Sequence, residues 1–317
     1  MNPAWPELPF DAWRDTHETL HRWLQIVGKI RLAQSPWVNH SWSVTLYVTA
    51  RGLTTLAIPH GEESFQLDFD FVDQRLWVHA GRGRRSLALE PQPVALFYRR
   101  LMTLLDDLGV PVTIHSKPSE LADAMPFEED EVHCAYDPEY ANRFWRVLAQ
   151  AQRVMDVFRG RFTGKSSPVQ FFWGNTDLAL TRFSGRRAPR HPGGRRHLPD
   201  RVLRDAYSEE CSECGFWPGG SESAEAVFYS LAYPEPPGFS SARLQPSQAR
   251  YSKELGEFVL PYEEVRRSSD PDAAVLDFLQ SAYEAAADRA GWDREALEPD
   301  LQGRFRPVRR GPARIAR

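Results

Sequence analysis

The chain has 317 residues, 42% of them hydrophobic and 12% aromatic, so it is long and apolar enough for a folded protein of one large domain or two smaller ones, and it is not a disordered chain. Its formal net charge of −4 argues against a general nucleic-acid-binding protein. No apolar run approaches the roughly 20 residues that span a bilayer, the N-terminus does not resemble a secretory signal, and three cysteines are too few for a disulfide framework, so we expect a cytoplasmic protein with no membrane segment.

The first part of the chain predicts a helix, several strands and a second helix. Leu20, Leu24, Val27 and Ile30 have helical spacing, and the helix is expected to open at Asp15 or Thr16. Alternating phenylalanines over 65–71 indicate a half-buried strand. Further strands are expected at 42–50, 53–58, 75–79, 86–89 and 112–115. A second helix, 94–108, follows two prolines and ends before Gly109.

The second part repeats this order after the acidic segment 118–139, which we expect to connect two halves. A long amphipathic helix is predicted over 140–161, and a final helix over 271–290 has Asp270-Pro271 as its start signal. Strands are expected at 176–182, 225–233 and 257–262. The stretch 185–204 is rich in Gly, Pro and Arg and is typical of a long loop.

Two segments of the chain resemble each other. Each follows a predicted helix, contains Ser-Pro and leads through aromatic residues into a strand: RLAQSPWVNHSWSVTLYVT (31–49) and GKSSPVQFFWGNTDLALT (164–181). Self-similarity of this kind indicates related structural units. The sequence therefore predicts an α+β fold of two related α-β(n)-α halves, 1–117 and 140–300, with mainly antiparallel sheets and a pseudo-two-fold internal repeat.

Arginines are concentrated in two places. The loop 185–204 could close over an anion through guanidinium forks, or it could be a solvated loop. The basic tail 301–317 is expected to be disordered.

Two short motifs could indicate a metal. His17-Glu18-Thr19-Leu20-His21 has the H-E-x-x-H form of zinc proteases, but it lies in the predicted first turn, where Asp15 and Glu18 also form a capping box. Cys211 and Cys214 form a C-x-x-C to which His133-Cys134 could add ligands, but without a second pair at known spacing the zinc signal is weak, and a packed turn is the favoured explanation. We therefore favour no metal; His21, His133 and Asp177 are weak candidate ligands.

The segment Gly164-Lys165-Ser166-Ser167 could hold an anion. It resembles the end of a phosphate loop but lacks the earlier glycine, and a polar turn is the alternative interpretation. A lysine beside two hydroxyls can bind a carboxylate or phosphate. We assign the predicted anion to Lys165, Ser167, Arg182 and Arg186, with Trp173 and Trp217 as pocket walls.

Asp177 lies within a predicted strand, where a carboxylate is disfavoured unless it is paired or functional. Alternation places Arg182 on the opposite face, so the partner of Asp177 is expected from the other half or from Glu209 and Glu210. Asp177 and Glu210 are the candidate acid–base residues.

Several sequence blocks, in order along the chain from Trp13 to about Leu297, together resemble a bacterial family, domain-of-unknown-function family 5996. The most specific blocks are NHSWSVTLYVTARGLTT (39–55), GKSSPVQFFWGNTDLALTRFSGR (164–186) and AYSEECSECGFWPGG (206–220). The resemblance implies a soluble module over the whole chain and brings no known activity or cofactor. In the family pattern, histidines stand at the positions of Gln170 and Glu209. The residues that match the pattern, and that the resemblance adds to a shared pocket, are His21, His40, His133, Asp177 and Glu210.

Three classes of function remain open at this point. The leading hypothesis is a pocket between the halves that binds, and could turn over, a small anionic molecule; His40, Gln170 and Glu209 are added to its ligand-binding residues. The second is a non-catalytic scaffold in which the same residues are fully paired. The third is a metal-dependent hydrolase, which requires at least three of His21, His40, His133, Asp177, Glu209 and Glu210 to lie together.

Overall fold

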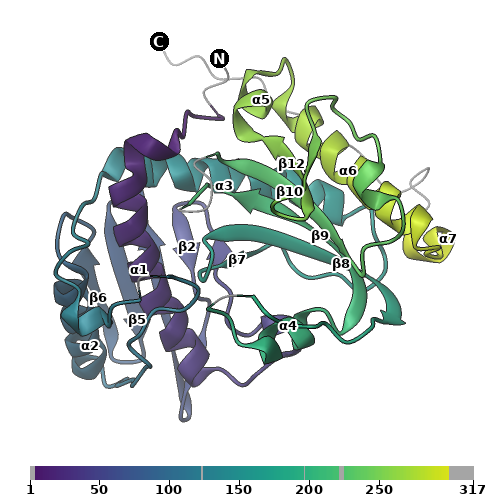
Figure 1. Ribbon diagram of the computed structural model, residues 1–317. Helices are drawn as coiled ribbons and strands as arrows, with labels where there is room; N and C mark the ends of the chain where they lie inside the picture. Colours follow the sequence, from purple (N-terminus) through teal and green to yellow (C-terminus); the bar gives the residue numbers. More distant parts are fainter. Residues whose placement is uncertain (1–3, 123, 196, 221–224, 300–317) are drawn as a thin grey trace.

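The structure, a computed structural model, describes residues 4–122, 124–195, 197–220 and 225–299 (Figure 1). This part of the chain folds into two antiparallel sheets of six strands each, packed with α-helices. The mixed α+β fold with antiparallel sheets is therefore confirmed. The predicted tail 301–317 lies outside the described residues.

The first sheet has the strand order β1-β2-β4-β5-β6, and β3 pairs with β4. Its strands are β1 (Tyr47–Val48), β2 (Gly52–Thr54), β3 (Ile58–His60), β4 (Glu63–Asp70), β5 (Arg75–Ala80) and β6 (Gly83–Ala88). The alternating side chains Phe65, Leu67 and Phe69 are buried, as a strand with one covered face requires. Helix α1 (Phe10–Gln34) contacts β3, and α2 (Val94–Asp107) contacts α1 and β6.

The second sheet has the strand order β11-β12-β10-β9-β8-β7. Its strands are β7 (Gln170–Phe172), β8 (Asp177–Arg187), β9 (Glu209–Trp217), β10 (Val227–Tyr233), β11 (Arg250–Ser252) and β12 (Glu257–Pro261). The helices of this half are α3 (Pro138–Arg159), α4 (Asp200–Ala206), α5 (Tyr262–Arg267), α6 (Pro271–Arg289) and α7 (Arg294–Leu297). Short 3-10 helices, η1 (Asn39–Ser41), η2 (Phe127–Glu129) and η3 (Phe239–Ser241), lie in the connections.

The two sheets are joined at one point. Leu46 and Phe171 exchange two backbone hydrogen bonds of 2.9 and 2.8 Å, which link the start of β1 to β7. Helix α3 contacts strands of both sheets, and the Trp173 indole packs so closely on α1 that a Cβ on Gly28 would lie 2.3 Å from it. The halves therefore share one hydrophobic core.

The predicted internal repeat is not confirmed. Shortly after the two Ser-Pro pairs, the first segment forms η1 and the second forms strand β7. The following block forms a two-residue strand in the first half and the eleven-residue strand β8 in the second. Similar sequence in these segments therefore produces different local structure.

Several predicted boundaries differ from the structure. Helix α1 begins at Phe10 rather than Asp15, because Phe10 and Trp13 are buried and extend its apolar face towards the N-terminus. The predicted capping box is therefore wrong, and His17 lies inside the helix. Residues 209–217 form a central strand instead of a turn, and 112–115 form no strand. The start signal Asp270-Pro271 is confirmed at α6, where Asp270 accepts from the Ala273 N–H.

The Arg-rich segment is less loop-like than predicted. Strand β8 runs to Arg187, and the segment ends in α4. Between them, the His191 ring lies 5.1 Å from the Tyr207 ring and 4.9 Å from the Tyr233 ring, and Tyr233 donates to the Pro189 carbonyl. These contacts attach the Arg-rich segment to the second sheet, so that side chains of this segment can lie over the sheet.

Candidate functional site

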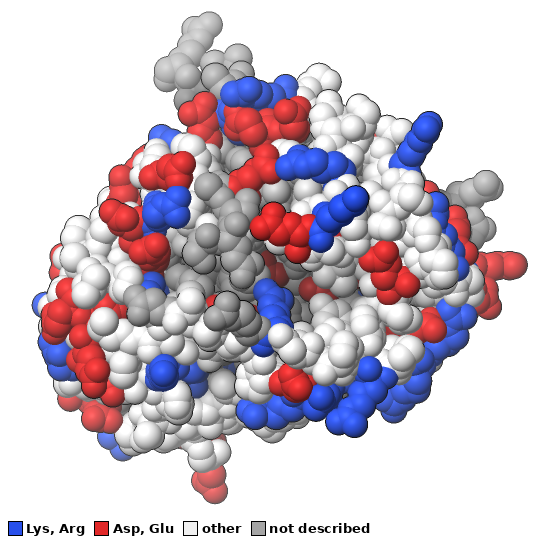
Figure 2. All heavy atoms as spheres, viewed as in Figure 1, with Lys and Arg blue, Asp and Glu red and all other residues white. Residues whose placement is uncertain are grey.

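The structure brings together four carboxyl groups, Asp177, Glu213, Glu257 and Glu120, which we call the carboxylate cluster. The charge of at least one other member shifts the pKa of Glu120, Glu213 and Glu257. Asp177 is buried, whereas the other three are partly exposed. In Figure 2 the middle of the displayed face is hollowed, and acidic atoms are visible inside the hollow beside a basic side chain.

Strand pairing places three members of the cluster on one face of the second sheet. Thr181 of β8 pairs with Glu213 of β9, and Asp177 is four residues from Thr181, so Asp177 and Glu213 share a face. Glu213 pairs with Leu231 of β10, and Glu257 opens the neighbouring strand β12. Because Ser230 pairs with Phe258, the register puts Glu257 opposite Leu231 and so on the same face.

Burial raises the pKa of each of these carboxyl groups. The pKa of Asp177 rises to about 6, mainly because the ionised form is desolvated. Desolvation, followed by repulsion from Asp177, raises the pKa of Glu213 to about 7. Desolvation, followed by repulsion from Glu213, raises the pKa of Glu257 to about 8. The three groups therefore titrate on both sides of neutral pH.

Tyr229 of β10 orients Asp177. The Tyr229 hydroxyl donates a 2.6 Å hydrogen bond to Asp177 Oδ2, and this bond opposes the rise in the Asp177 pKa. Tyr229 is on β10 and Asp177 is on β8, so the phenol must cross the intervening strand β9, which it does over Gly215. A side chain at this position would block it, because a Cβ on Gly215 would lie 2.6 Å from the phenol oxygen and 2.1 Å from the Leu178 carbonyl. Gly215 is thus required for the hydrogen bond between Tyr229 and Asp177.

The first half and the connecting segment close the other side of the cluster. Glu120 packs against the β7–β8 turn, so that a Cβ on Gly174 would lie 2.0 Å from Glu120 Oε1. Burial raises the pKa of Glu120, and the charge of Asp177 adds to the rise. Helix α1 holds the same turn: His21 Nε2 donates to the Gly174 carbonyl at 3.0 Å, and His17 Nε2 lies 3.0 Å from Thr176 Oγ1. The turn that positions Asp177 is therefore fixed by α1.

The cation of the cluster comes from the Arg-rich segment. The charge of Arg195 lowers the pKa of Asp177, Glu213, Glu257 and Glu120, against the stronger effect of burial. The segment is held near the cluster by a 3.2 Å hydrogen bond from the Glu120 N–H to the His197 carbonyl. One guanidinium thus acts on four carboxyl groups.

Both histidines of the H-E-x-x-H motif contribute to structure. Burial lowers the pKa of His17 and lowers that of His21 to about 4, so both rings are neutral at pH 7. In the described part of the chain, no three His, Cys, Asp or Glu side chains are placed to hold a metal ion. His133 lies elsewhere, with Nδ1 2.8 Å from Asp130.

The C-x-x-C motif does not form a pair of ligands. Cys211 and Cys214 are three residues apart on β9 and therefore point to opposite faces of the sheet. Both thiols are buried, and burial raises the pKa of Cys214 to about 12. Their role in the structure is to fill the two layers that the strand separates.

Three predicted ligand-binding residues do meet, at a second location. Lys165 Nζ donates to His40 Nε2 and to Glu209 Oε1, each at 2.8 Å. The ammonium lies 4.6 Å from the centre of the Phe183 ring, and His40 Nδ1 donates to the Ala206 carbonyl. Desolvation and the Lys165 charge lower the pKa of His40. The charge of Lys165 is therefore satisfied within the protein.

Gln170, Ser167 and Trp173 lie inside the protein. Gln170 accepts a 3.2 Å hydrogen bond from Thr45 and so links the halves beside the β1–β7 junction. Ser167 Oγ accepts from the Thr181 N–H, and Trp173 Nε1 donates to the Val44 carbonyl. All three are at most 6% exposed, and their contacts position strand β8, which carries Asp177.

Arg182 and Arg186 are also engaged by the protein. Arg182 lies on the sheet face opposite Asp177, as predicted, and its guanidinium stacks on the rings of Phe158 and Tyr283. Arg186 binds Glu210 through Nε at 2.8 Å and donates to the carbonyls that follow α6. Glu210 also accepts from Ser184.

Trp217 ends β9, on the same face as Asp177 by register. It is partly exposed, and a Cβ on Gly220 would lie 3.0 Å from its ring. Trp217 is therefore a partly exposed aromatic side chain on the Asp177 face.

Sequence reasoning found Asp177 but missed Glu213, Glu257, Glu120 and Tyr229. A signal for Glu213 was present in the sequence. If 209–217 had been predicted as a strand, alternation would have placed Glu213 on one face together with Cys211, Gly215 and Trp217. Glu257 and Tyr229 join Asp177 only through the order β12-β10-β9-β8, which one sequence does not specify.

The fold and the cluster define a mixed α+β protein with two antiparallel sheets and a partly enclosed group of carboxyl side chains between its halves. A family described as a family of unknown function (DUF5996) matches residues 5–299, and the chain belongs to that family. No curated protein and no solved structure shows a match. In the described residues, none of the helices combines the length and apolarity needed to cross a bilayer.

Proposed function

We propose that this protein binds a small molecule bearing a cationic nitrogen in the hollow between its halves, with the Asp177 carboxylate as the counter-charge. The observation that carries this proposal is the presence of Asp177, Glu213 and Glu257 on one sheet face, with Glu120 opposite. At pH 7 a pKa of about 6 leaves Asp177 mostly ionised. Desolvated, negatively charged side chains of this kind favour a cation that replaces water.

The charge of the ligand follows from the contacts of the predicted anion-binding residues. Lys165 and Arg186 are paired with carboxylates, and Arg182 lies on the other face of the sheet. These three cations are not available between the halves, where the single guanidinium of Arg195 acts on four carboxyl groups and leaves acidic groups in excess. For that reason the ligand proposed for this location is positively charged.

The same groups could also transfer a proton. A pKa of about 8 keeps most Glu257 carboxyl groups protonated at pH 7, whereas Asp177 is ionised. One base and one acid in a shared, desolvated space are the components of general acid–base catalysis. Under this proposal Asp177 orients the ligand or accepts its proton, and Glu257 donates one.

Binding of spermidine and agmatine, measured by calorimetry and thermal shift, tests this proposal. Both cations are expected to bind more strongly at pH 8 than at pH 5, because the carboxyl groups ionise over this range. Asp177→Asn should weaken binding by about tenfold or more, since it removes a desolvated counter-charge.

The matched control is Asp107→Asn, which removes an exposed carboxylate at the end of α2 and should leave binding unchanged. The proposal fails if neither cation binds at pH 8, or if Asp177→Asn binds as well as the control. Circular dichroism establishes that both variants are folded.

A further inference from the structure

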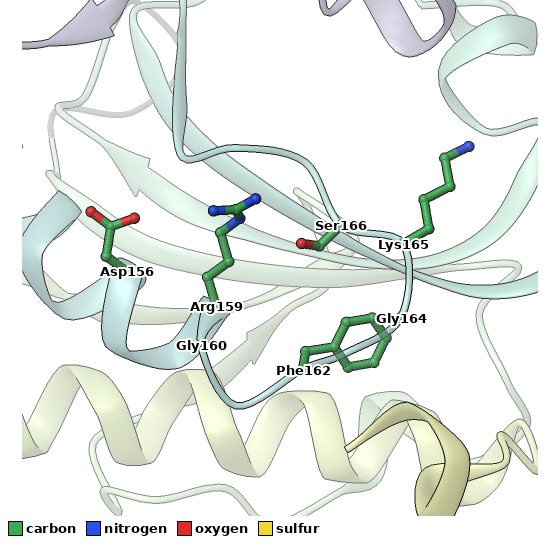
Figure 3. Close-up of a pocket in the computed structure, with 7 residues that line it drawn as sticks. All are labelled: Asp156, Arg159, Gly160, Phe162, Gly164, Lys165 and Ser166. Atoms are coloured by element: carbon green, nitrogen blue, oxygen red, sulfur yellow. The ribbon is translucent and has the colours of Figure 1, made fainter. Parts of the chain in front are cut away.

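The loop between α3 and β7 combines a cavity with hydrogen-bond donors that have no partner among the described residues. The loop 160–166, between α3 and β7, borders an open hollow of about 510 Å³. Figure 3 shows the residues that line it: Asp156, Arg159, Gly160, Phe162, Gly164, Lys165 and Ser166. The hollow contains none of the carboxylate-cluster residues, so it is a separate site.

The backbone of this loop offers the Ser166 N–H group to the hollow. The N–H groups of Thr163 and Ser167 donate to Leu297 and Thr181, each at 2.8 Å. Within the described part of the chain, those of Gly164, Lys165 and Ser166 have no acceptor. The Lys165 carbonyl and the Ser167 N–H bond to β8, so the intervening Ser166 N–H points away from that strand. A free, outward-facing N–H group of this kind can donate to an anion.

Arg159 supplies the positive charge. Its Nε donates to the Ser167 carbonyl at 2.7 Å, which fixes the guanidinium, and neither Nη atom has a partner among the described residues. In Figure 3 the Arg159 guanidinium and the Ser166 hydroxyl point towards one another. A guanidinium held through Nε presents its remaining donors as a fork that matches two oxygens of an oxyanion.

Lys165 and Asp156 limit which anion fits. The Lys165 ammonium is directed away from the hollow, towards Glu209 and His40 (Figure 3), so it contributes no direct contact. Asp156 lies on the same side as Arg159, and burial raises the pKa of its carboxyl group. A carboxylate beside an anion site favours an oxyanion that also carries a hydroxyl hydrogen, which the carboxylate can accept.

From these contacts we propose that the hollow binds the phosphate group of a small phosphate monoester. The Arg159 fork, the Ser166 hydroxyl and the Ser166 N–H group donate to its oxygens. Asp156 accepts the hydrogen of the P–OH group of the monoanion. This site does not depend on the function proposed for the carboxylate cluster.

Titration with inorganic phosphate and glycerol phosphate, followed by calorimetry, tests the proposal. Arg159→Gln should weaken binding by about tenfold or more, and Ser166→Ala should weaken it by a smaller factor. Arg143→Gln, the same substitution on α3 beside Glu139, is the control and should change binding by less than about twofold. Binding should be stronger at pH 5.5 than at pH 8, and Asp156→Asn should remove this preference.

Two results would overturn the site. One is the lack of saturable phosphate binding at concentrations up to about 10 mM. The other is equal binding by wild type, Arg159→Gln and Ser166→Ala. Because Arg159 also supports the Ser167 carbonyl, Ser166→Ala serves as the variant that leaves the loop contacts in place. Asp177→Asn should bind phosphate normally, which separates this result from that of the cation experiment.

Discussion

Arg182 shows how a cation is tolerated in the core of this protein. The side chain is 1% exposed, and its guanidinium carbon lies 3.4 Å from the centre of the Phe158 ring and 4.4 Å from that of Tyr283. Nη2 donates to the Phe158 carbonyl at the end of α3, whereas Nε and Nη1 have no hydrogen-bond partner in the described chain. Burial lowers its pKa to about 10. Aromatic faces thus replace the carboxylate that usually accompanies a buried arginine.

Arg182→Met is expected to leave the free energy of unfolding within about 1 kcal/mol of wild type, because it keeps the volume and removes a desolvated charge with unmade hydrogen bonds. Arg182→Ala should cost about 2–4 kcal/mol, because it leaves a cavity among the rings of Phe158, Phe162 and Tyr283. Urea unfolding of both variants measures the difference. Equal losses in the two variants would show that the charge itself stabilises the fold.

At the scale of elements, contact between α1 and the β7–β8 turn depends on Gly28. Gly28→Ala would gain up to about 1 kcal/mol in helix propensity. The new Cβ would meet the Trp173 ring at 2.3 Å, so we expect a net loss of about 1–3 kcal/mol. The midpoints of urea unfolding of wild type and Gly28→Ala measure this loss of stability.

The control for this substitution is Gly81→Ala, where the Cβ would lie 3.3 Å from the end of the flexible Glu63 side chain. We expect it to change stability by less than about 0.5 kcal/mol. If Gly28→Ala were as stable as this control, the close packing of Trp173 on α1 would not limit the approach of the two elements.

Local signals predicted the long elements well and the site poorly. The starts of α3 and α6 follow from Asp-Pro pairs, because aspartate caps a helix and proline fits its first turn. Strand β9 was missed because glycine and proline follow it and because its two cysteines suggested a turn. The carboxylate cluster joins residues up to 137 positions apart, Glu120 and Glu257. Their proximity depends on strand order, which has no local signature.

The stability of the whole molecule should depend on pH through two groups of buried residues that act in opposite directions. Raised pKa values of about 6, 7 and 8 mean that native Asp177, Glu213 and Glu257 bind protons more tightly than the unfolded chain, so stability falls as pH rises from about 4 to 8. The lowered pKa of His21, about 4, has the opposite effect: stability falls as pH drops from 6.5 to 4. Three carboxyl groups outweigh His21 where the two ranges overlap, so we expect the maximum at about pH 4, on the acidic side of that overlap.

Glu257→Gln should remove much of the alkaline decline. At pH 8.5 the variant is expected to be about 1–3 kcal/mol more stable than wild type, whereas at pH 5 the two should be similar, because native Glu257 is then protonated. Urea midpoints at both pH values give the comparison. The exposed Glu264→Gln is the control; an equal gain in it at pH 8.5 would contradict a specific effect of Glu257.

The junction between the sheets also has a kinetic consequence. Thr45 and Gln170, beside the Leu46–Phe171 pair, are 125 residues apart in the chain. Contacts between residues so far apart in the chain form only after a large loop has closed. The loss of entropy in that closure is greater than for local elements such as helices. Helix α1 of the first half fixes the turn before Asp177, so we expect the carboxylate cluster to reach its final arrangement only after the halves have docked. Cation binding would then report docking of the halves and lag behind the appearance of secondary structure during refolding.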